Sequence, residues 1–279
     1  MAMAETRTPR IAKPKRASSA RDGTQSLRRA ISILRLLSQS NEKGLSLADA
    51  VRGSGLNKAT THRILNALVA EGFAGQDGQT RNYFLGFELV ALGIAANPRY
   101  GIAQVAKPFV TKLAEELGDT VYLSVRSRDD AVCVMREVGS FPIKTLTFPP
   151  GARTPLGLGS GSVVLLAFLS EAERTRIIRE TVQRLQGSEQ SISEAELTEN
   201  VKRTRKNGYA SVGNYIVNGM RAIAMPIHAP DGTVAAAISV ASIEQRLDGK
   251  RLQLAIKVLQ RECAALEQRL RSSQIKLDF

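Results

Sequence analysis

The spacing of apolar residues restricts the stretch 25–71 to short helices. Apolar residues recur at helical spacing in a first segment, and the same pattern returns in two further segments. Ser46 and Asn57 stand directly before these two segments, and both are favoured N-cap residues because their side-chain oxygens accept a hydrogen bond from a free backbone N–H. Glycines close the second and third segments. We therefore expect three consecutive helices.

A short hairpin is expected directly after the third helix. Phe73–Ala74 and Tyr83–Leu85 are brief apolar segments on either side of Asp77-Gly78, a pair that is typical of tight turns. Three short helices followed by a hairpin are the layout of a winged helix-turn-helix. We predict this fold for residues 25–86.

The pattern of the sequence changes after residue 100. Residues 87–100 are expected to form a linker helix that is apolar over Phe87–Ala95 and ends at Asn97-Pro98. Beyond it, alternating apolar residues predict strands and amphipathic stretches predict helices. The expected strands are 120–125, 131–137, 144–148, 209–214, 220–229 and 233–241, and the expected helices are 105–117, 162–169, 171–181, 193–207 and 250–271. This order indicates an α+β domain with an antiparallel sheet over 101–272, and leaves 273–279 as a tail.

Positive charge is concentrated near the N-terminus. The chain has a formal charge of +13 and a pI of about 10.1, which points to a polyanion such as nucleic acid as partner. Residues 1–24 hold six Lys and Arg against Glu5 and Asp22, with almost no large apolar residues. We therefore expect a disordered basic arm that can add phosphate contacts. The alternative is a surface charge that only keeps the protein in solution.

The third helix is the candidate for contacting DNA. With its apolar residues turned to the core, the polar side chains near its N-terminus face outward. The candidate DNA contacts are Lys58, Thr60, His62 and Arg63 on this helix, and Arg81 in the wing. Lys and Arg suit phosphate oxygens or guanine, Thr suits a thymine methyl group, and a wing arginine can reach the minor groove or the backbone. The alternative is that these charges are ordinary solvated side chains and that His62 is structural.

These motifs resemble one known family along most of the chain. Leu56–Leu65 and Tyr83-Phe84-Leu85-Gly86 look like the DNA-binding domain of the IclR family of transcriptional regulators. Pro155-Leu156 with its following small residues, Gly208-Tyr209-Ala210, Gly219-Met220-Arg221 and Ile238-Ser239-Val240 are similar to that family's effector domain. The resemblance implies double-stranded operator DNA as partner, a GAF-like effector domain, homodimers or homotetramers, and control of a catabolic operon. Members repress or activate, and we favour repression.

A Gly-rich loop is the candidate effector site. Gly157–Ser162 leads into an apolar helix, and free N–H groups at a helix N-terminus attract anions such as carboxylates. The alternative is that these glycines serve only a tight turn. The resemblance implies that the effector binds at this loop, and that Ser239 matches a serine of the family's pocket. The candidate effector-binding residues are Leu156, Gly159, Ser160, Gly161 and Ser239.

Several positions depart from the family pattern, mostly towards lower polarity. Ser211-Val212 stands where many members have an acidic residue, Ala222 where many have Cys, and Ala241 where a second serine often occurs. Gly157–Ser160 replaces a His-Ala-Thr-Ala-like stretch, and Arg81-Asn82 replaces a Gly-basic pair in the wing. Our hypothesis is an effector carboxylate less polar than glyoxylate or pyruvate, either aromatic or branched.

An enzyme and an architectural DNA-bridging protein are the two alternatives to a regulator. The only histidines, His62 and His228, fall in different predicted domains, and Cys133 and Cys263 have no metal or redox spacing. We therefore expect no catalytic residues, no metal and no cofactor. A bridging protein would not require a large sensor-like domain. Apolar runs shorter than the ~18 residues of a membrane span, and the lack of a secretory signal, predict a cytoplasmic protein with no membrane partner.

Overall fold

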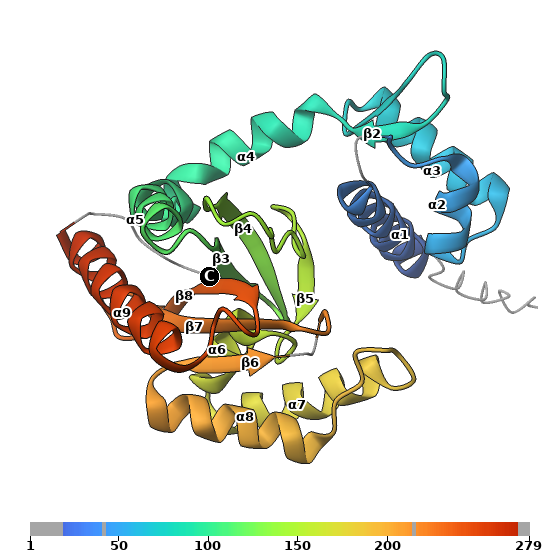
Figure 1. The fold of residues 1–279 in the computed structure, drawn as a ribbon. Coiled ribbons are helices and arrows are strands. Elements are labelled where there is room, and N and C mark those ends of the chain that lie inside the picture. Colours follow the sequence, from blue (N-terminus) through green and yellow to red (C-terminus); the bar gives the residue numbers. More distant parts are fainter. Residues whose placement is uncertain (1–18, 41–42, 214–215, 273–279) are drawn as a thin grey trace, which may run out of the picture. The chain divides into compact units, whose positions relative to one another are not determined.

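The computed structural model describes residues 19–40, 43–213 and 216–272 (Figure 1). The chain divides into two compact units, residues 1–90 and 91–279, which meet within helix α4 (Phe87–Tyr100). No helix in the described ranges is long and apolar enough to cross a membrane. Each unit is described by itself.

The first unit has the predicted order of three helices and a hairpin. Its elements are α1 (Ser19–Gln39), α2 (Leu47–Ser54), α3 (Lys58–Ala70), β1 (Ala74–Gln76) and β2 (Tyr83–Leu85). The helices pack around a small core that contains Ile33, Leu37, Ala50, Leu65, Leu68, Ala74 and Tyr83. This arrangement confirms the predicted N-terminal helix-turn-helix domain.

Side-chain caps fix where α2 and α3 begin. The Ser46 side chain accepts a hydrogen bond from the Asp49 N–H at 3.1 Å, and the Asn57 side chain accepts one from the Thr60 N–H at 2.8 Å. Such a bond satisfies one of the N–H groups that a helix start leaves free. Gly55 ends α2 in the left-handed region with a φ of 65°. The direction in which α3 leaves the α2–α3 turn is therefore set by local hydrogen bonds.

The hairpin is held against the helices by a third extended segment. Leu45 exchanges two backbone hydrogen bonds of 2.9 Å with Tyr83, and the Asn82 side chain donates to the Lys43 carbonyl oxygen at 2.8 Å. Gly86 directly follows β2. A Cβ atom on Gly86 would lie 1.9 Å from the Gly72 carbonyl oxygen. Only glycine therefore fits at this close approach of two backbone segments.

Near the first unit, two predicted helix limits differ from the structure. Helix α1 begins at Ser19, so residues 19–24 are helical where the sequence predicts disorder, because extending an existing helix costs little once its first turn has formed. Residues 1–18 of the predicted basic arm and the predicted tail 273–279 lie outside the described residues. Helix α4 continues through Pro98 to Tyr100 rather than ending at 97–98, because proline removes one helical hydrogen bond without always ending a helix.

The second unit is built on a six-stranded antiparallel sheet with strand order β5-β4-β3-β8-β7-β6. The strands are β3 (Thr120–Ser127), β4 (Asp130–Val138), β5 (Arg153–Pro155), β6 (Ala210–Gly213), β7 (Met220–His228) and β8 (Val234–Ile243). The predicted hairpins at 120–137 and 220–241 are therefore confirmed, and so is the α+β class.

Helices cover both faces of this sheet (Figure 1). Helices α5 (Ile102–Leu117) and α9 (Gly249–Ser272) pack on one face, and α6 (Ser160–Ala167), α7 (Glu171–Leu185) and α8 (Glu194–Asn207) lie on the other. The large residues Val121, Leu123, Ile223, Ile238 and Val240 contribute to the core with α5 and α9. The small residues Ala131, Ala210, Ala224 and Ala237 contribute to the core with α6.

The strand predicted at 144–148 is wrong. No strand is found there in the described residues. Residues 139–152, between β4 and β5, form neither a helix nor a strand. Backbone hydrogen bonds join Cys133 to Gly151 and Ala152, at 2.7 and 2.9 Å, and β5 continues this pairing along β4. Within the described part of the chain, this pairing involves only 151–155. Residues 144–148 lie before Pro149-Pro150, which lack the backbone N–H donors that a continued strand pairing needs.

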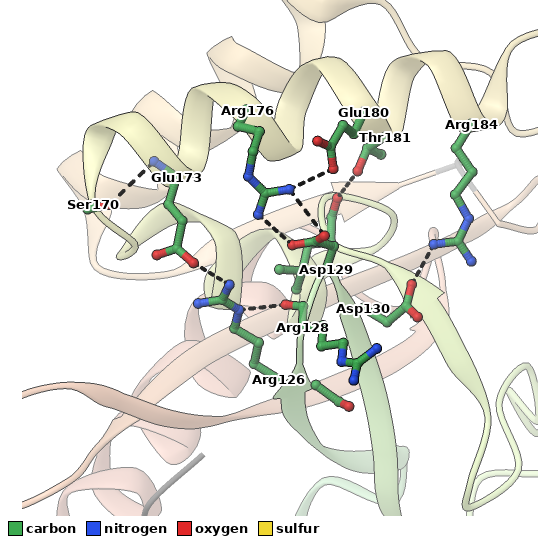
Figure 2. Close-up of polar contacts among 12 residues, drawn as sticks. Arg126, Arg128, Asp129, Asp130, Ser170, Glu173, Arg176, Glu180, Thr181 and Arg184 are labelled. Carbon is green, nitrogen blue, oxygen red and sulfur yellow. Dashed lines mark hydrogen bonds and ion pairs between the residues drawn. The ribbon is translucent and has the colours of Figure 1, made fainter. Parts of the chain in front are cut away.

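The turn between β3 and β4 is fastened to α7 by ion pairs (Figure 2). Both terminal nitrogens of Arg176 donate to the Asp129 carboxylate, at 2.8 and 3.2 Å. Two further pairs flank this contact: Arg126–Glu173 at 2.5 Å and Arg184–Asp130 at 2.6 Å. The positive φ of Arg128, 60°, makes the turn that brings both aspartates towards the helix.

Arg176→Ala should lower the melting temperature at pH 7 more than Arg179→Ala, whose pair with Glu194 spans 3.7 Å with the Arg179 side chain 70% exposed. Hydrogen bonds from Arg176 hold the pKa of the Asp129 carboxyl below its ordinary 3.8. The stabilisation by the Asp129 carboxylate is thus present above pH 3.8 and lost as the pH falls through the lower folded-state pKa. Thermal unfolding followed from pH 7 into acid would show the difference between the variants shrink. Equal melting temperatures at pH 7 would contradict the prediction.

Candidate functional site

The N-terminal half of α3 presents polar side chains to solvent. Lys58, His62 and Arg63 are exposed and Thr60 is partly exposed, whereas Thr61 on the inner side is fully buried. Within the described part of the chain, Lys58 and Arg63 form no ion pair. Two unpaired cations at the start of an exposed helix suit the binding of an anion or of base edges.

Arg81 lies in the turn between β1 and β2. It is exposed and has a positive φ of 61°, which is uncommon for a residue other than glycine. The Asp77 carboxylate holds the turn by accepting from the N–H groups of Gln79 and Thr80, at 3.1 and 2.6 Å, and Gln76 donates to the Arg81 carbonyl oxygen at 3.0 Å. The local backbone is therefore fixed while the Arg81 side chain faces solvent.

A cavity lies on the α6 face of the sheet in the second unit. It measures about 730 Å³, including the part that is open to solvent. Its walls come from all six strands of the sheet, from the start of α6, from the irregular segment that precedes β5, and from residues 216–217 before β7. This mixed lining of apolar and polar side chains suits a small organic molecule.

One end of the cavity is polar. Gly159 precedes α6 with a φ of 90°, and no side chain caps this helix. The first helical hydrogen bond is donated by the Val163 N–H to the Gly159 carbonyl oxygen. The N–H groups of residues 160–162 lie before this bond and therefore have no partner within the helix. A Cβ atom on Gly161 would lie 3.7 Å from the hydroxyl oxygens of both Ser124 and Ser239. The missing side chain leaves room between two hydroxyls and a helix N-terminus.

Aromatic and small residues form another part of the wall. The rings of Tyr122 and Phe148 meet edge to face, with centroids 6.2 Å apart and planes at 72°. Ala222 and Ala241 are register partners on β7 and β8, and they pack with Cys133 in the same cluster. The Tyr122 hydroxyl donates to the Thr145 carbonyl oxygen. Burial raises the pKa of Tyr122, so its hydroxyl stays neutral.

The charges at the cavity are already compensated. Arg221 is the charged residue among the described lining residues. Its guanidinium donates to Glu244 at 2.8 Å, to Asp248 at 3.2 Å and to the Leu247 carbonyl oxygen at 3.1 Å. The cavity therefore offers hydroxyl and N–H donors, and no unpaired cation among its described residues.

The comparison with known families identifies the chain. Residues 26–78 match the family described as IclR helix-turn-helix domain, and residues 95–267 match the one described as bacterial transcriptional regulator IclR C-terminal. The chain belongs to the IclR family. It is a transcriptional regulator with a DNA-binding helix-turn-helix, and the relatives that carry this assignment are regulators and not enzymes.

Known proteins resemble this IclR regulator over most of their length. It is 32% identical to the HTH-type transcriptional regulator BhcR of Paracoccus denitrificans over 82% of this chain and 81% of that protein. It is 31% identical to the HTH-type transcriptional repressor AllR of Salmonella typhi over 84% and 85%.

Solved structures share the fold. An IclR transcriptional regulator from Alicyclobacillus acidocaldarius matches with a TM-score of 0.74 and 24% identity, covering 88% of this chain and 98% of that one. An IclR homologue from Microbacterium hydrocarbonoxydans, complexed with 4-hydroxybenzoate, matches with a TM-score of 0.72 and 20% identity over 89% and 100%. At these identities the likeness concerns the fold.

The sequence-predicted effector residues do not all reach the cavity of this IclR regulator. Gly159, Ser160, Gly161 and Ser239 line it. Leu156 is fully buried in the core beneath α6 and is not among the described lining residues. Lining residues that sequence reasoning missed include Tyr122, Ser124, Cys133, Thr145, Thr147 and Phe148. Alternation along β3 and β4 could have indicated Tyr122, Ser124 and Cys133, whereas 145–148 were assigned to a strand that does not form.

The thiol of Cys133 should react slowly in the native protein. Burial raises its pKa to about 11 from an ordinary 9.0, so the reactive thiolate fraction at pH 8, and with it the rate of alkylation, should be about a hundredfold smaller. Mass spectrometry of Cys133 peptides after timed iodoacetamide treatment measures this rate. The same treatment in denaturant is the control, and native alkylation at the denatured rate would contradict the buried position of Cys133.

Proposed function

We propose that this IclR-family protein is a repressor that binds operator DNA as a dimer and is controlled by a small organic acid bound in the cavity. The observation that carries the proposal is that one chain combines an exposed cationic helix N-terminus with a cavity lined by apolar side chains and hydrogen-bond donors. The relative AllR is a transcriptional repressor, which favours repression. The 4-hydroxybenzoate complex of a structural neighbour supports a small-molecule effector.

In the proposed complex, the start of α3 enters the major groove. Lys58 and Arg63 are placed at phosphates or guanine edges, and Thr60 at a thymine methyl group or a phosphate. His62 is exposed on the same helix and is proposed as a further contact. Arg81 is proposed to reach the neighbouring minor groove or backbone, because the wing turn leaves its side chain free.

Exposed apolar residues on α4 support a dimer. Phe87, Val90, Leu92 and Ile94 are 76%, 52%, 53% and 68% exposed. A continuous stretch of large apolar side chains in water is unusual for a monomer and marks a contact surface. A symmetric dimer would place two copies of α3 in successive major grooves, roughly 34 Å apart, on a near-palindromic operator.

The effector is proposed to change DNA affinity by binding one conformation of the dimer better than the other. The Gly159–Gly161 loop and Ser239 are proposed as its contacts, and Leu156 as a residue that positions the loop from the core beneath it. The change in operator affinity cannot exceed the effector's preference for one conformation. The effector must therefore bind free and DNA-bound protein with different affinities.

A mobility-shift titration tests the proposal. The probe is DNA from upstream of the protein's own gene, with excess non-specific competitor and at two salt concentrations. A shift that survives competitor and is reversed by a small acid supports a regulated repressor. Binding that competitor removes at every site tried would leave only non-specific attraction to DNA. A specific shift that no small molecule alters would favour an architectural role.

Arg63→Ala should weaken specific DNA binding by about 1–3 kcal/mol if Arg63 reads a base, or lower the salt dependence by about one counterion if it meets a phosphate. Arg179→Ala is the matched control, since Arg179 is an exposed arginine in the second unit. Fluorescence anisotropy with labelled operator at several salt concentrations measures both quantities. Identical binding by wild type and Arg63→Ala would remove Arg63 from the interface.

Charge on α4 should break the proposed dimer. Phe87→Glu and Ile94→Glu place a carboxylate in the apolar stretch, and each should raise the dimer dissociation constant by about tenfold or more. Leu254→Glu is the control, because Leu254 is an exposed leucine on α9, with 49% exposure. Sedimentation velocity over a concentration series measures the constant. A dimer that tolerates both α4 variants would place the subunit contact elsewhere.

A further inference from the structure

We infer that the cavity selects an aromatic acid with a single carboxylate, and that Ala222, Ala241 and Gly161 determine this selection. The inference rests on the proposed function, because it names the class of effector that the cavity takes. The class of proposed effectors is narrowed from small organic acids in general to acids with one aromatic ring and one carboxylate. It is carried by the donors at one end of the cavity, by the compensated charge at its wall, and by the small residues of its floor.

The polar end holds the carboxylate. Ser160 and Ser239 are 3% and 7% exposed, and both line the cavity. Both hydroxyls border the cavity, and neither forms a hydrogen bond within the described residues. A ligand oxygen in the cavity would accept a hydrogen bond from each of them. The free N–H groups at the start of α6 add donors beside them and favour a negative charge at the same place.

The remaining wall cannot hold a second negative charge. The charged residue among the described lining residues is Arg221, and its three recorded hydrogen bonds go to Glu244, Asp248 and a carbonyl oxygen. Two carboxylates already face this one guanidinium. A second ligand carboxylate would enter the cavity without a cation and would lose its water, which is strongly unfavourable. The cavity therefore discriminates against dicarboxylates.

The floor of the cavity has room for a ring. Ala222 and Ala241 are paired across β7 and β8, and both line the cavity beside Tyr122. A larger side chain at either position would project into this space. The edge-to-face pair of Tyr122 and Phe148 presents aromatic surface to whatever lies on the floor, which favours an aromatic ring over a short aliphatic chain. A two- or three-carbon acid would leave this apolar surface without contact.

A matched set of small molecules tests each proposed requirement for the ligand, namely the ring, the charge and the single carboxylate, on the full-length protein. Isothermal titration calorimetry compares benzoate with terephthalate, which adds a second carboxylate to the same ring, and with benzamide, which removes the charge. Pyruvate keeps the carboxylate and removes the ring. Benzoate should bind, and the other three should bind at least about tenfold more weakly, terephthalate roughly a hundredfold. Terephthalate or pyruvate binding as tightly as benzoate would overturn the inference.

Three substitutions assign the selection to named residues. Ala222→Val and Ala241→Val should each weaken benzoate binding about tenfold or more by filling the floor. Gly161→Ala adds a methyl group 3.7 Å from the Ser124 and Ser239 hydroxyls, in ordinary contact with both, and should abolish binding by occupying the carboxylate position. Ala195→Val is the matched control, because Ala195 is an exposed alanine on α8 and does not line the cavity.

Gly161→Ala keeps the assignment testable if the valine variants fail to fold, because alanine favours a helix more than glycine does. Circular dichroism checks each variant. Benzoate binding that survives Gly161→Ala unchanged would overturn the assignment of the polar end. Operator binding is measured on the same preparations. If no acid of the set binds while specific operator binding persists, the inference fails and the DNA-binding part of the proposed function stands. If specific operator binding also fails, the proposed function fails with it.

Discussion

The alternation of large and small side chains along the central strands governs the whole second unit. On β7 and β8, the residues Ile223, Ile238 and Val240 fill the core under α5 and α9. Their neighbours in sequence, which point to the other face, are Ala222, Ala224, Ala237, Ser239 and Ala241. Because successive strand residues face opposite sides, one strand pattern creates both a dense hydrophobic core and a hollow face. The cavity is a consequence of this composition and not of a gap in packing.

The Gly-rich segment before α6 converts this hollow into a site with a polar end. Gly159 and Gly157 have φ values of 90° and 101°, which side chains rarely adopt, and the chain there turns sharply onto the sheet. Helix α6 then starts directly above Ser124 and Ser239, with Gly161 between them. Helix α6 is apolar on all sides, and six of its residues after Gly161 are buried. Its first turn therefore cannot slide along the sheet, and its N–H groups are held at one place.

Local signals in the sequence were sufficient for much of the fold. Ser46, Asn57 and Asp77 each form a short-range hydrogen bond that sets a helix start or a turn, so the first unit follows from neighbours in sequence. The 144–148 prediction was wrong because strand formation depends on pairing with a distant segment, and the pairing along β4 begins only after Pro149-Pro150, at 151–155. Which residues line the cavity depends on such long-range pairing. Leu156 adjoins the Gly-rich loop, yet the buried hydrogen bond from Thr181 to its carbonyl oxygen, 2.9 Å, holds that backbone under α7.

Ion pairs connect the cavity wall with other parts of the second unit. The segment that follows β8 is tied to the cavity wall through Arg221, and to the end of α5 through Arg246 and Asp119, which lie 2.7 Å apart. Asp119 is buried, and Arg251 holds its second oxygen at 3.2 Å. The same Arg246 stacks 4.0 Å from the Phe141 ring, in the segment that goes on to line the cavity. Helix α5 follows directly on α4, the helix shared by the two units. A ligand that moves either wall therefore acts on groups that also hold the end of α5, and packed side chains and ion pairs of this kind are one means by which two sites are coupled.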